Sequence, residues 1–192
     1  MIKYPTKKTA YTNTSTNHGK LGMSLEEDIN QTNAFYLIMG RANIHKKPTP
    51  IQVVSVSYPA RNKAKIIEAY YQKPSTTDYN GVYKGYALDF EAKETNHPTY
   101  FSLKNIHEHQ LQHLKDVQQH GAIAFLIIRF SRYNETYLIF YQQVESFMQT
   151  HQRKSIPRSY LQQSATLIPY SLTPPVDYLS VIDRTIQTRS VL

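Results

Sequence analysis

The segment from Ala122 to Phe130 constrains the fold more than any other, because Arg129 is its one residue that is not apolar. Such a run is typical of a central strand that is covered on both faces of a sheet. It is far shorter than the roughly 20 apolar residues of a membrane-spanning helix. The N-terminus also lacks the apolar segment of a secretory signal. We therefore expect a soluble, intracellular protein built around this strand.

Shorter patterns on either side predict the other elements. Strands are expected over residues 51–56 and 136–141, and a β-hairpin over residues 78–94 that turns at Lys84-Gly85. Helices are expected over residues 24–39, 103–120 and 142–151, after Pro157, and from Pro174-Pro175 onward. Because helices and strands alternate, we predict an α/β fold in which helices flank a mixed central β-sheet.

The composition favours nucleic acid as the partner. Lys and Arg number 22 against 14 Asp and Glu, which gives a formal net charge of +8. A charge of this size favours a polyanion, with DNA or RNA ahead of a membrane surface. The absence of cysteine excludes disulfides, a cysteine nucleophile, thiolate zinc sites and iron–sulfur clusters. No glycine-rich phosphate loop and no Gly-x-Ser-x-Gly elbow occurs, so NTPase and α/β-hydrolase activities are not expected.

Positive charge gathers in two segments. Residues 1–23 carry four lysines and no acid, and they are expected to form a basic flexible arm. The second segment follows the first predicted strand, and Glu68 is its one acidic residue before the hairpin. Its candidate DNA-binding residues are Arg61, Lys63, Lys65 and Lys73. An ordinary solvated surface explains this second block equally well.

The predicted hairpin places two carboxylates side by side. If Lys84-Gly85 forms the loop, Tyr83 faces Tyr86 and Asp78 faces Glu91. Directly opposed residues have Cβ atoms roughly 5 Å apart, so the two negative charges repel unless a cation lies between them. Carboxylate oxygens suit Mg²⁺ or Mn²⁺. This pair is therefore a candidate site for a hard divalent cation.

Strand alternation adds two further side chains to the same face. Asp89, Glu91 and Lys93 share it, whereas the apolar residues between them point to a core. A lysine beside a metal can stabilise the transition state of phosphodiester hydrolysis. The alternative is a polar sheet face in which Lys93 forms a simple salt bridge.

The helix expected after the hairpin carries a glutamine on its apolar stripe. Gln110 is four residues from both Ile106 and Leu114, so its amide is predicted to be buried. It could complete a metal shell, or it could bond to backbone at the edge of the stripe. His109 and His113 are spaced as helical zinc ligands, but no glutamate lies between them. This favours solvated or phosphate-facing histidines over zinc.

These residues resemble a known family. Asp78 followed by Glu91-Ala92-Lys93 resembles the PD-(D/E)xK nuclease superfamily, although Thr77 replaces the usual proline. Longer strings look like the RecU-type Holliday junction resolvases of Gram-positive bacteria. They are Ile44-His-Lys-Lys-Pro-Thr-Pro-Ile51, Ser75-Thr-Thr-Asp-Tyr-Asn-Gly81, Tyr83-Lys-Gly85, Asp89-Phe-Glu-Ala-Lys-Glu-Thr95 and Pro174-Pro-Val-Asp-Tyr178.

The resemblance implies a restriction-endonuclease-like fold and a set of site residues. It implies that Thr76, Asp78, Glu91 and Gln110 hold Mg²⁺, which Mn²⁺ can replace, and that Lys93 stabilises the transition state. Asp78, Glu91 and Lys93 are the expected catalytic residues. The resemblance divides the chain into the arm, 1–23, and a nuclease domain, 24–192, with a stalk-like projection over about 52–77. Leu21 departs from the family, whose members often carry an arginine there.

The expected function is Mg²⁺-dependent endonucleolytic resolution of four-way junctions by paired nicks, in homologous recombination and DNA repair. A homodimer is expected, as are recombinase or branch-migration helicase partners and a cytoplasmic, nucleoid-associated location. No membrane partner is expected. Two alternatives remain at this point: a non-catalytic junction-binding modulator of recombination, and a restriction-type nuclease that cuts duplex DNA with the same fold.

Overall fold

A six-stranded mixed sheet forms the centre of the protein, whose computed structural model describes residues 24–72 and 76–189. The strand order is β1-β4-β5-β7-β8-β10, and β5 and β7 run parallel while the other neighbours are antiparallel. The fully buried β7 confirms the predicted central strand. The bounds are β1 Asn43–Lys46, β4 Tyr79–Tyr83, β5 Tyr86–Thr95, β7 Ile123–Phe130, β8 Glu135–Phe140 and β10 Thr166–Ile168.

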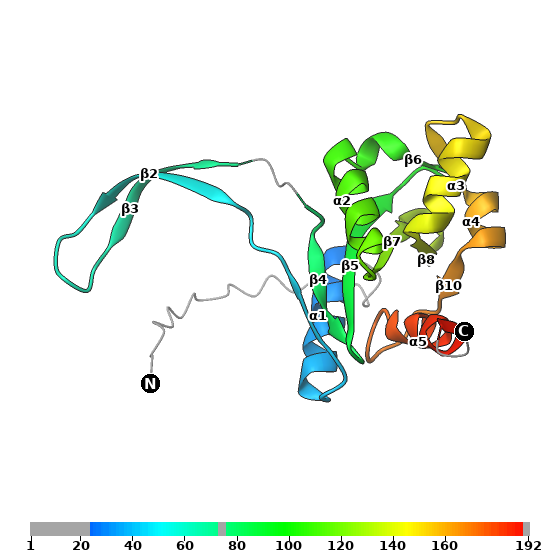
Figure 1. Ribbon diagram of the computed structural model, residues 1–192, viewed down its shortest axis with the longest axis horizontal. Helices are drawn as coiled ribbons and strands as arrows, with labels where there is room; N and C mark the ends of the chain where they lie inside the picture. The colour runs from blue at the N-terminus through cyan, green and yellow to red at the C-terminus, as the bar shows by residue number, and fades with distance from the viewer. Residues whose placement is uncertain (1–23, 73–75, 190–192) are drawn as a thin grey trace, which may run out of the picture.

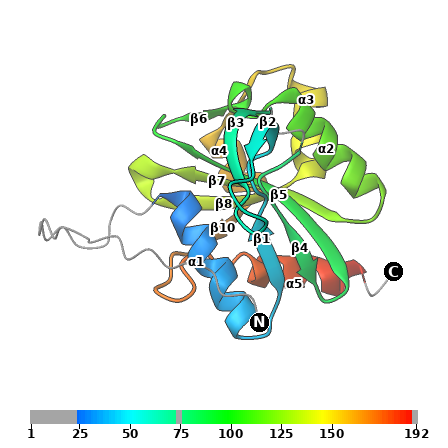
Figure 2. The same cartoon turned by 90° about the vertical axis from the view of Figure 1, so that its left-hand side faces the viewer.

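Helices cover both faces of this sheet (Figures 1 and 2). α1, Leu25–Ile38, and α5, Leu179–Arg189, pack with one hydrophobic core. The second core contains residues of α2, Glu108–Gln119, α3, Tyr141–His151, and α4, Arg158–Ser164. Alternate residues of β7 enter the two cores, as period-two alternation requires. The predicted α/β class with a mixed sheet flanked by helices is confirmed.

Small elements complete the body of the protein. β6, Tyr100–Ser102, pairs with β9, Ser155–Pro157, and the 3-10 helices span Leu103–Asn105 and Ser131–Tyr133. Within the described residues, no helix is long and apolar enough to cross a membrane.

A separate two-stranded sheet projects from the body and forms the stalk (Figure 1). It consists of β2, Ile51–Ser57, and β3, Lys65–Tyr71, which pair antiparallel with a register irregularity between Val53 and Val56. Every residue of β3 is exposed. The sequence patterns predicted β2 but missed β3, because β3 has no polar alternation that marks a buried face. The projection itself agrees with the expected stalk.

The β4–β5 hairpin has the predicted register. Lys84 and Gly85 both adopt positive φ, 49° and 81°, as the two central residues of a type I′ turn do. Tyr83 faces Tyr86, and the ladder continues to Tyr79 opposite Phe90. On the face away from α2, stacked rings reinforce this register, with centroid separations of 4.8 Å for Tyr79–Phe90 and 4.6 Å for Phe90–Phe125. The register places Asp78 next to Glu91.

Two helices begin later than predicted. The helix expected from 103 starts at Glu108, because Ile106 is extended and the side chain of Gln110 accepts the N–H of His107 at the helix start. The last helix starts at Leu179 and not at Pro174-Pro175. The segment before it forms a Tyr170–Val176 bridge and contains a cis Thr173–Pro174 peptide.

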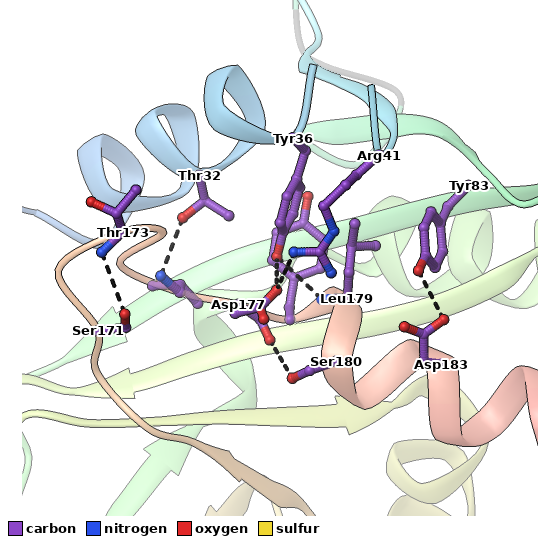
Figure 3. A network of polar contacts seen from close by, with 12 residues as sticks. Thr32, Tyr36, Arg41, Tyr83, Ser171, Thr173, Asp177, Leu179, Ser180 and Asp183 are labelled. Carbon is purple, nitrogen blue, oxygen red and sulfur yellow. Dashed lines mark hydrogen bonds and ion pairs between the residues drawn. The ribbon is translucent and has the colours of Figure 1, made fainter. Parts of the chain in front are cut away.

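Side-chain contacts to α1 hold this segment before α5 (Figure 3). The hydroxyl of Thr32 accepts the N–H of Val176 at 3.1 Å, and the hydroxyl of Tyr36 donates to Asp177 at 2.6 Å. Arg41 lies 3.6 Å from the same carboxylate. These contacts hold a non-helical segment of bends and a turn where proline alone suggested a helix.

Candidate active site

The three predicted catalytic residues meet at the edge of the β4–β5 hairpin. Asp78 immediately precedes β4, and its main-chain N–H donates to Oε2 of Glu91 at 3.0 Å. Lys93 forms an ion pair with Oε1 of Glu91, and its Nζ lies 4.0 Å from Oδ2 of Asp78. Glu91 and Lys93 lie on one face of β5 because they are two residues apart. The sequence therefore placed Asp78, Glu91 and Lys93 together correctly.

Burial distinguishes the two carboxylates. Glu91 is fully buried, whereas the side chain of Asp78 is 37% exposed. The pKa of Glu91 is raised to about 7, mainly by burial and also by the nearby Asp78, while Lys93 opposes the rise. Oε1 of Glu91 has no hydrogen bond of ordinary geometry beyond its ion pair. A buried oxygen of this kind, beside an accessible carboxylate, fits a divalent cation.

Thr76 and Gln110, the other predicted metal ligands, have other hydrogen bonds. The hydroxyl of Thr76 lies 3.4 Å from the carbonyl oxygen of Thr77. Gln110 is buried, as its place on the apolar stripe predicted, and its Oε1 accepts the N–H of His107 at 3.0 Å. A carbonyl oxygen has a second lone pair, so this bond does not prevent metal ligation. Their ligand role stays a prediction.

The histidines of the described residues form no metal-binding cluster. Among the residues that the structure describes, no group of three or more His, Asp and Glu side chains is arranged to hold a metal. A cation at Asp78 and Glu91 would therefore need oxygen ligands of another kind, which Thr76 and Gln110 carry.

Sequence reasoning missed a polar cluster beside the carboxylate pair. Asp89, nearly buried on the same face of β5, accepts a hydrogen bond from Thr77 Oγ1. Its Oδ2 also lies 3.0 Å from Lys47 Nζ and 3.2 Å from His113 Nε2. His113 therefore pairs with Asp89 and does not form a zinc site with His109. No local pattern pointed to Lys47, which is 42 residues from Asp89 in sequence.

Three of the four candidate DNA-binding residues lie on the stalk. Lys65 begins β3, and Arg61 and Lys63 lie in the exposed connection between β2 and β3. Lys73 and the arm, residues 1–23, fall outside the described residues, as does Leu21. The described part of the basic block is therefore presented at the projecting end of the stalk (Figure 1).

Comparisons with known proteins agree on one family. The family model for recombination protein U matches residues 20–184. A Staphylococcus aureus protein named Holliday junction resolvase RecU is 50% identical over 176 residues, which cover 90% of this chain and 85% of that protein. A protein of the same name from Bacillus cytotoxicus is 50% identical over 169 residues, 86% of this chain and 84% of that protein.

Among solved structures, the chain is similar to Hjc, a Holliday junction resolvase from Archaeoglobus fulgidus. The TM-score is 0.44 and the sequence identity is 15%, over 74% of this chain and 93% of that chain.

Proposed function

Because this chain belongs to the recombination protein U family, we propose that it resolves four-way DNA junctions by Mg²⁺-dependent paired nicks. It is a Holliday junction resolvase, and so an endodeoxyribonuclease of DNA recombination. The proposal extends this assignment to the metal, the site residues, the assembly and a role in DNA repair. The contact that carries it is the pairing of Asp78 with Glu91 beside Lys93.

The donor set supports Mg²⁺ as the cofactor. Asp78 and Glu91 would hold the ion, with Thr76 and Gln110 supplying neutral oxygens, and Mn²⁺ would substitute because it prefers the same ligands. When bound, the metal supplies Lewis-acid stabilisation of the phosphodiester and a more acidic water.

Lys93 has a separate role from the carboxylates. Its ammonium pairs with Glu91 and lies 4.0 Å from Asp78, and its side chain is 23% exposed, so it can face a phosphate while it remains paired with Glu91. There it would stabilise the negative charge that develops on the scissile phosphate. Because Glu91 holds it in place, this charge is already oriented before the substrate arrives.

Charge and shape support DNA-junction binding. The net charge of +8 supplies attraction to phosphates. The stalk extends well beyond the body and carries Arg61, Lys63 and Lys65. A projection of this kind can reach the centre of a four-way junction, where several backbones converge, whereas a single duplex offers no such opening.

Resolution requires one nick in each of two opposed strands. One chain carries one Asp78–Glu91 pair, so two sites related by two-fold symmetry are needed. We therefore include a homodimer in the proposal. A recombinase or branch-migration helicase partner and a cytoplasmic, nucleoid-associated location follow from the same substrate. The nuclease domain would span 24–192, with 1–23 as a basic arm.

A supercoiled plasmid that extrudes a cruciform tests this function. With Mg²⁺, the full chain is expected to give linear product, because both strands are cut within one encounter. A nicked circle as the sole product would contradict paired nicking. Equal cutting of a plasmid without the cruciform would favour a restriction-type duplex nuclease, and binding without cutting would favour a junction-binding modulator.

A further inference from the structure

Two chain segments meet where the stalk joins the body. Residues 47–50 lead from β1 into β2, and residues 76–78 lead into β4. The main-chain N–H of Lys47 donates to the carbonyl oxygen of Asp78 at 2.7 Å. Asp78 is thus bonded by its N–H to Glu91 and by its carbonyl to Lys47. The backbone of Asp78 is therefore held on both sides. Neither bond fixes the residues before Asp78, which depend on other contacts.

Thr77 supplies those contacts from a buried position. The residue is 2% exposed, and its hydroxyl donates to Oδ1 of Asp89. The hydroxyl oxygen of Thr77 also accepts a 3.0 Å hydrogen bond from Lys47 Nζ. Lys47 Nζ is also 3.0 Å from Oδ2 of Asp89, and His113 approaches that oxygen from α2. The charge of Asp89 is therefore paired, and the Thr77 hydroxyl bridges both charged groups.

The cluster of Thr77, Lys47 and Asp89 links the two segments that carry the catalytic carboxylates. Thr77 directly precedes Asp78, and Asp89 is two residues before Glu91 on the same face of β5. Loss of the Thr77 hydroxyl would leave Lys47 and Asp89 paired, but it would release the side-chain link between the two strands. Asp78 lies just outside the β4–β5 ladder, which begins at Tyr79, so the ladder alone does not hold it.

We propose that Thr77 is a positioning residue, which with Lys47 and Asp89 clamps Asp78 against Glu91 in the geometry that cleavage requires. The proposal rests on the proposed function, because it concerns the same site. Thr77 itself would touch neither metal nor DNA. A displacement of about 1 Å at a reacting group can cost roughly 100-fold in rate. Release of the clamp should therefore lower the cleavage rate and weaken the response to Mg²⁺, while DNA affinity stays unchanged.

The test compares Thr77→Val with Thr77→Ser in the full chain. Valine keeps the shape and removes the hydroxyl, and serine restores it. Thr136→Val is the matched control, because Thr136 is also buried and its hydroxyl accepts from Arg129 Nε at 3.0 Å. For each variant we would measure single-turnover cleavage of a labelled junction, the Mg²⁺ concentration for half-maximal rate, junction affinity in EDTA and the melting temperature.

We expect Thr77→Val to cut about 10- to 100-fold more slowly and to need more Mg²⁺, with junction affinity within about 2-fold of wild type. Thr77→Ser should cut within about 3-fold of wild type, and Thr136→Val should lose stability without losing rate. If Thr77→Val melts below the assay temperature, Thr77→Ala, which leaves room for water beside Asp89, replaces it.

A normal rate and Mg²⁺ response in Thr77→Val, or equal rate losses in Thr77→Val and Thr136→Val, would overturn the clamp. Failure of serine to restore the rate would do so as well. These outcomes leave the proposed function intact, because that function is tested by what the wild-type chain itself does to the junction.

Discussion

The main-chain N–H of Asp78 donates a 3.0 Å hydrogen bond to the carboxylate of Glu91, which is 13 residues further along the chain. This bond joins the start of β4 to the middle of β5. It brings Asp78, whose carboxylate is accessible, beside the buried carboxylate of Glu91. The hairpin register therefore aligns the two residues, and Lys93 adds a positive charge beside them.

Substitution of the site residues should separate cleavage from binding. Asp78→Asn and Glu91→Gln remove proposed metal ligands, and Lys93→Ala removes transition-state charge, so each should slow cleavage by about 100-fold or more. Junction affinity, measured by mobility shift in EDTA, should change little because it comes from phosphate contacts elsewhere.

The matched controls for these variants are Glu145→Gln and Lys115→Ala, since Glu145 and Lys115 form a 3.2 Å ion pair between α3 and α2. Both should cut at the wild-type rate. A wild-type rate in Glu91→Gln would contradict the assigned site.

The stalk should contribute to junction selectivity. Replacement of Arg61, Lys63 and Lys65 by alanine is expected to reduce junction affinity about 10-fold more than duplex affinity, because the stalk reaches the convergence of phosphates only in a junction. Competition binding at one salt concentration measures both. A control that removes three positive charges from exposed positions of the body uses Lys104, Arg153 and Lys154. Equal losses on both substrates would show that the stalk supplies non-specific attraction alone.

A buried ion pair anchors α1 to the sheet. Asp28 Oδ2 lies 2.7 Å from Arg129 on β7, and both side chains are 5% exposed. Asp28→Ala leaves a buried arginine without this partner, so the free energy of unfolding should fall by about 3–5 kcal/mol. The exposed pair of Lys46 with Glu26 provides the comparison. Glu26→Ala should lower the free energy of unfolding, measured in urea, by less than about 1 kcal/mol. Equal losses in Asp28→Ala and Glu26→Ala would contradict the larger effect expected for the buried pair.

Gly81 is required by close packing between β1 and β4. A Cβ built on Gly81 would lie 2.3 Å from the carbonyl oxygen of Asn43 and 2.5 Å from Cα of Ile44. Both are backbone atoms that cannot move away easily, so Gly81→Ala should cost at least about 1–3 kcal/mol in the free energy of unfolding. Gly40→Ala is the comparison, because its Cβ meets nothing within 4 Å and strains only a positive φ of 63°. A smaller loss for Gly81→Ala than for Gly40→Ala would be the contrary result.

Local chemistry made much of the site predictable. The Lys84-Gly85 turn sets the pairing of β4 with β5, and alternation along β5 then sorts Glu91 and Lys93 from Phe90. Burial of Gln110 likewise followed from helical periodicity. In each case a residue's position depends on neighbours within one hairpin or one helix.

The parts of the fold and site that the sequence did not predict depend mostly on contacts between distant segments. Lys47 reaches Asp89 only because β1 pairs with β4, and no pattern within either segment specifies that pairing. The start of the last helix was missed for a similar reason. The bond of Val176 to Thr32, 144 residues away, holds non-helical backbone directly after a Pro-Pro sequence that permits a helix.

The most direct measurement is cleavage of an end-labelled four-way junction by the wild-type chain and by the Asp78→Asn/Glu91→Gln double variant, each with Mg²⁺ and with EDTA. The wild-type chain should cut two opposed strands with Mg²⁺ and none with EDTA, and the double variant should bind the junction but leave it intact. Mg²⁺-dependent cutting by the double variant, or cutting by the wild-type chain in EDTA, would contradict a metal-dependent active site at Asp78 and Glu91.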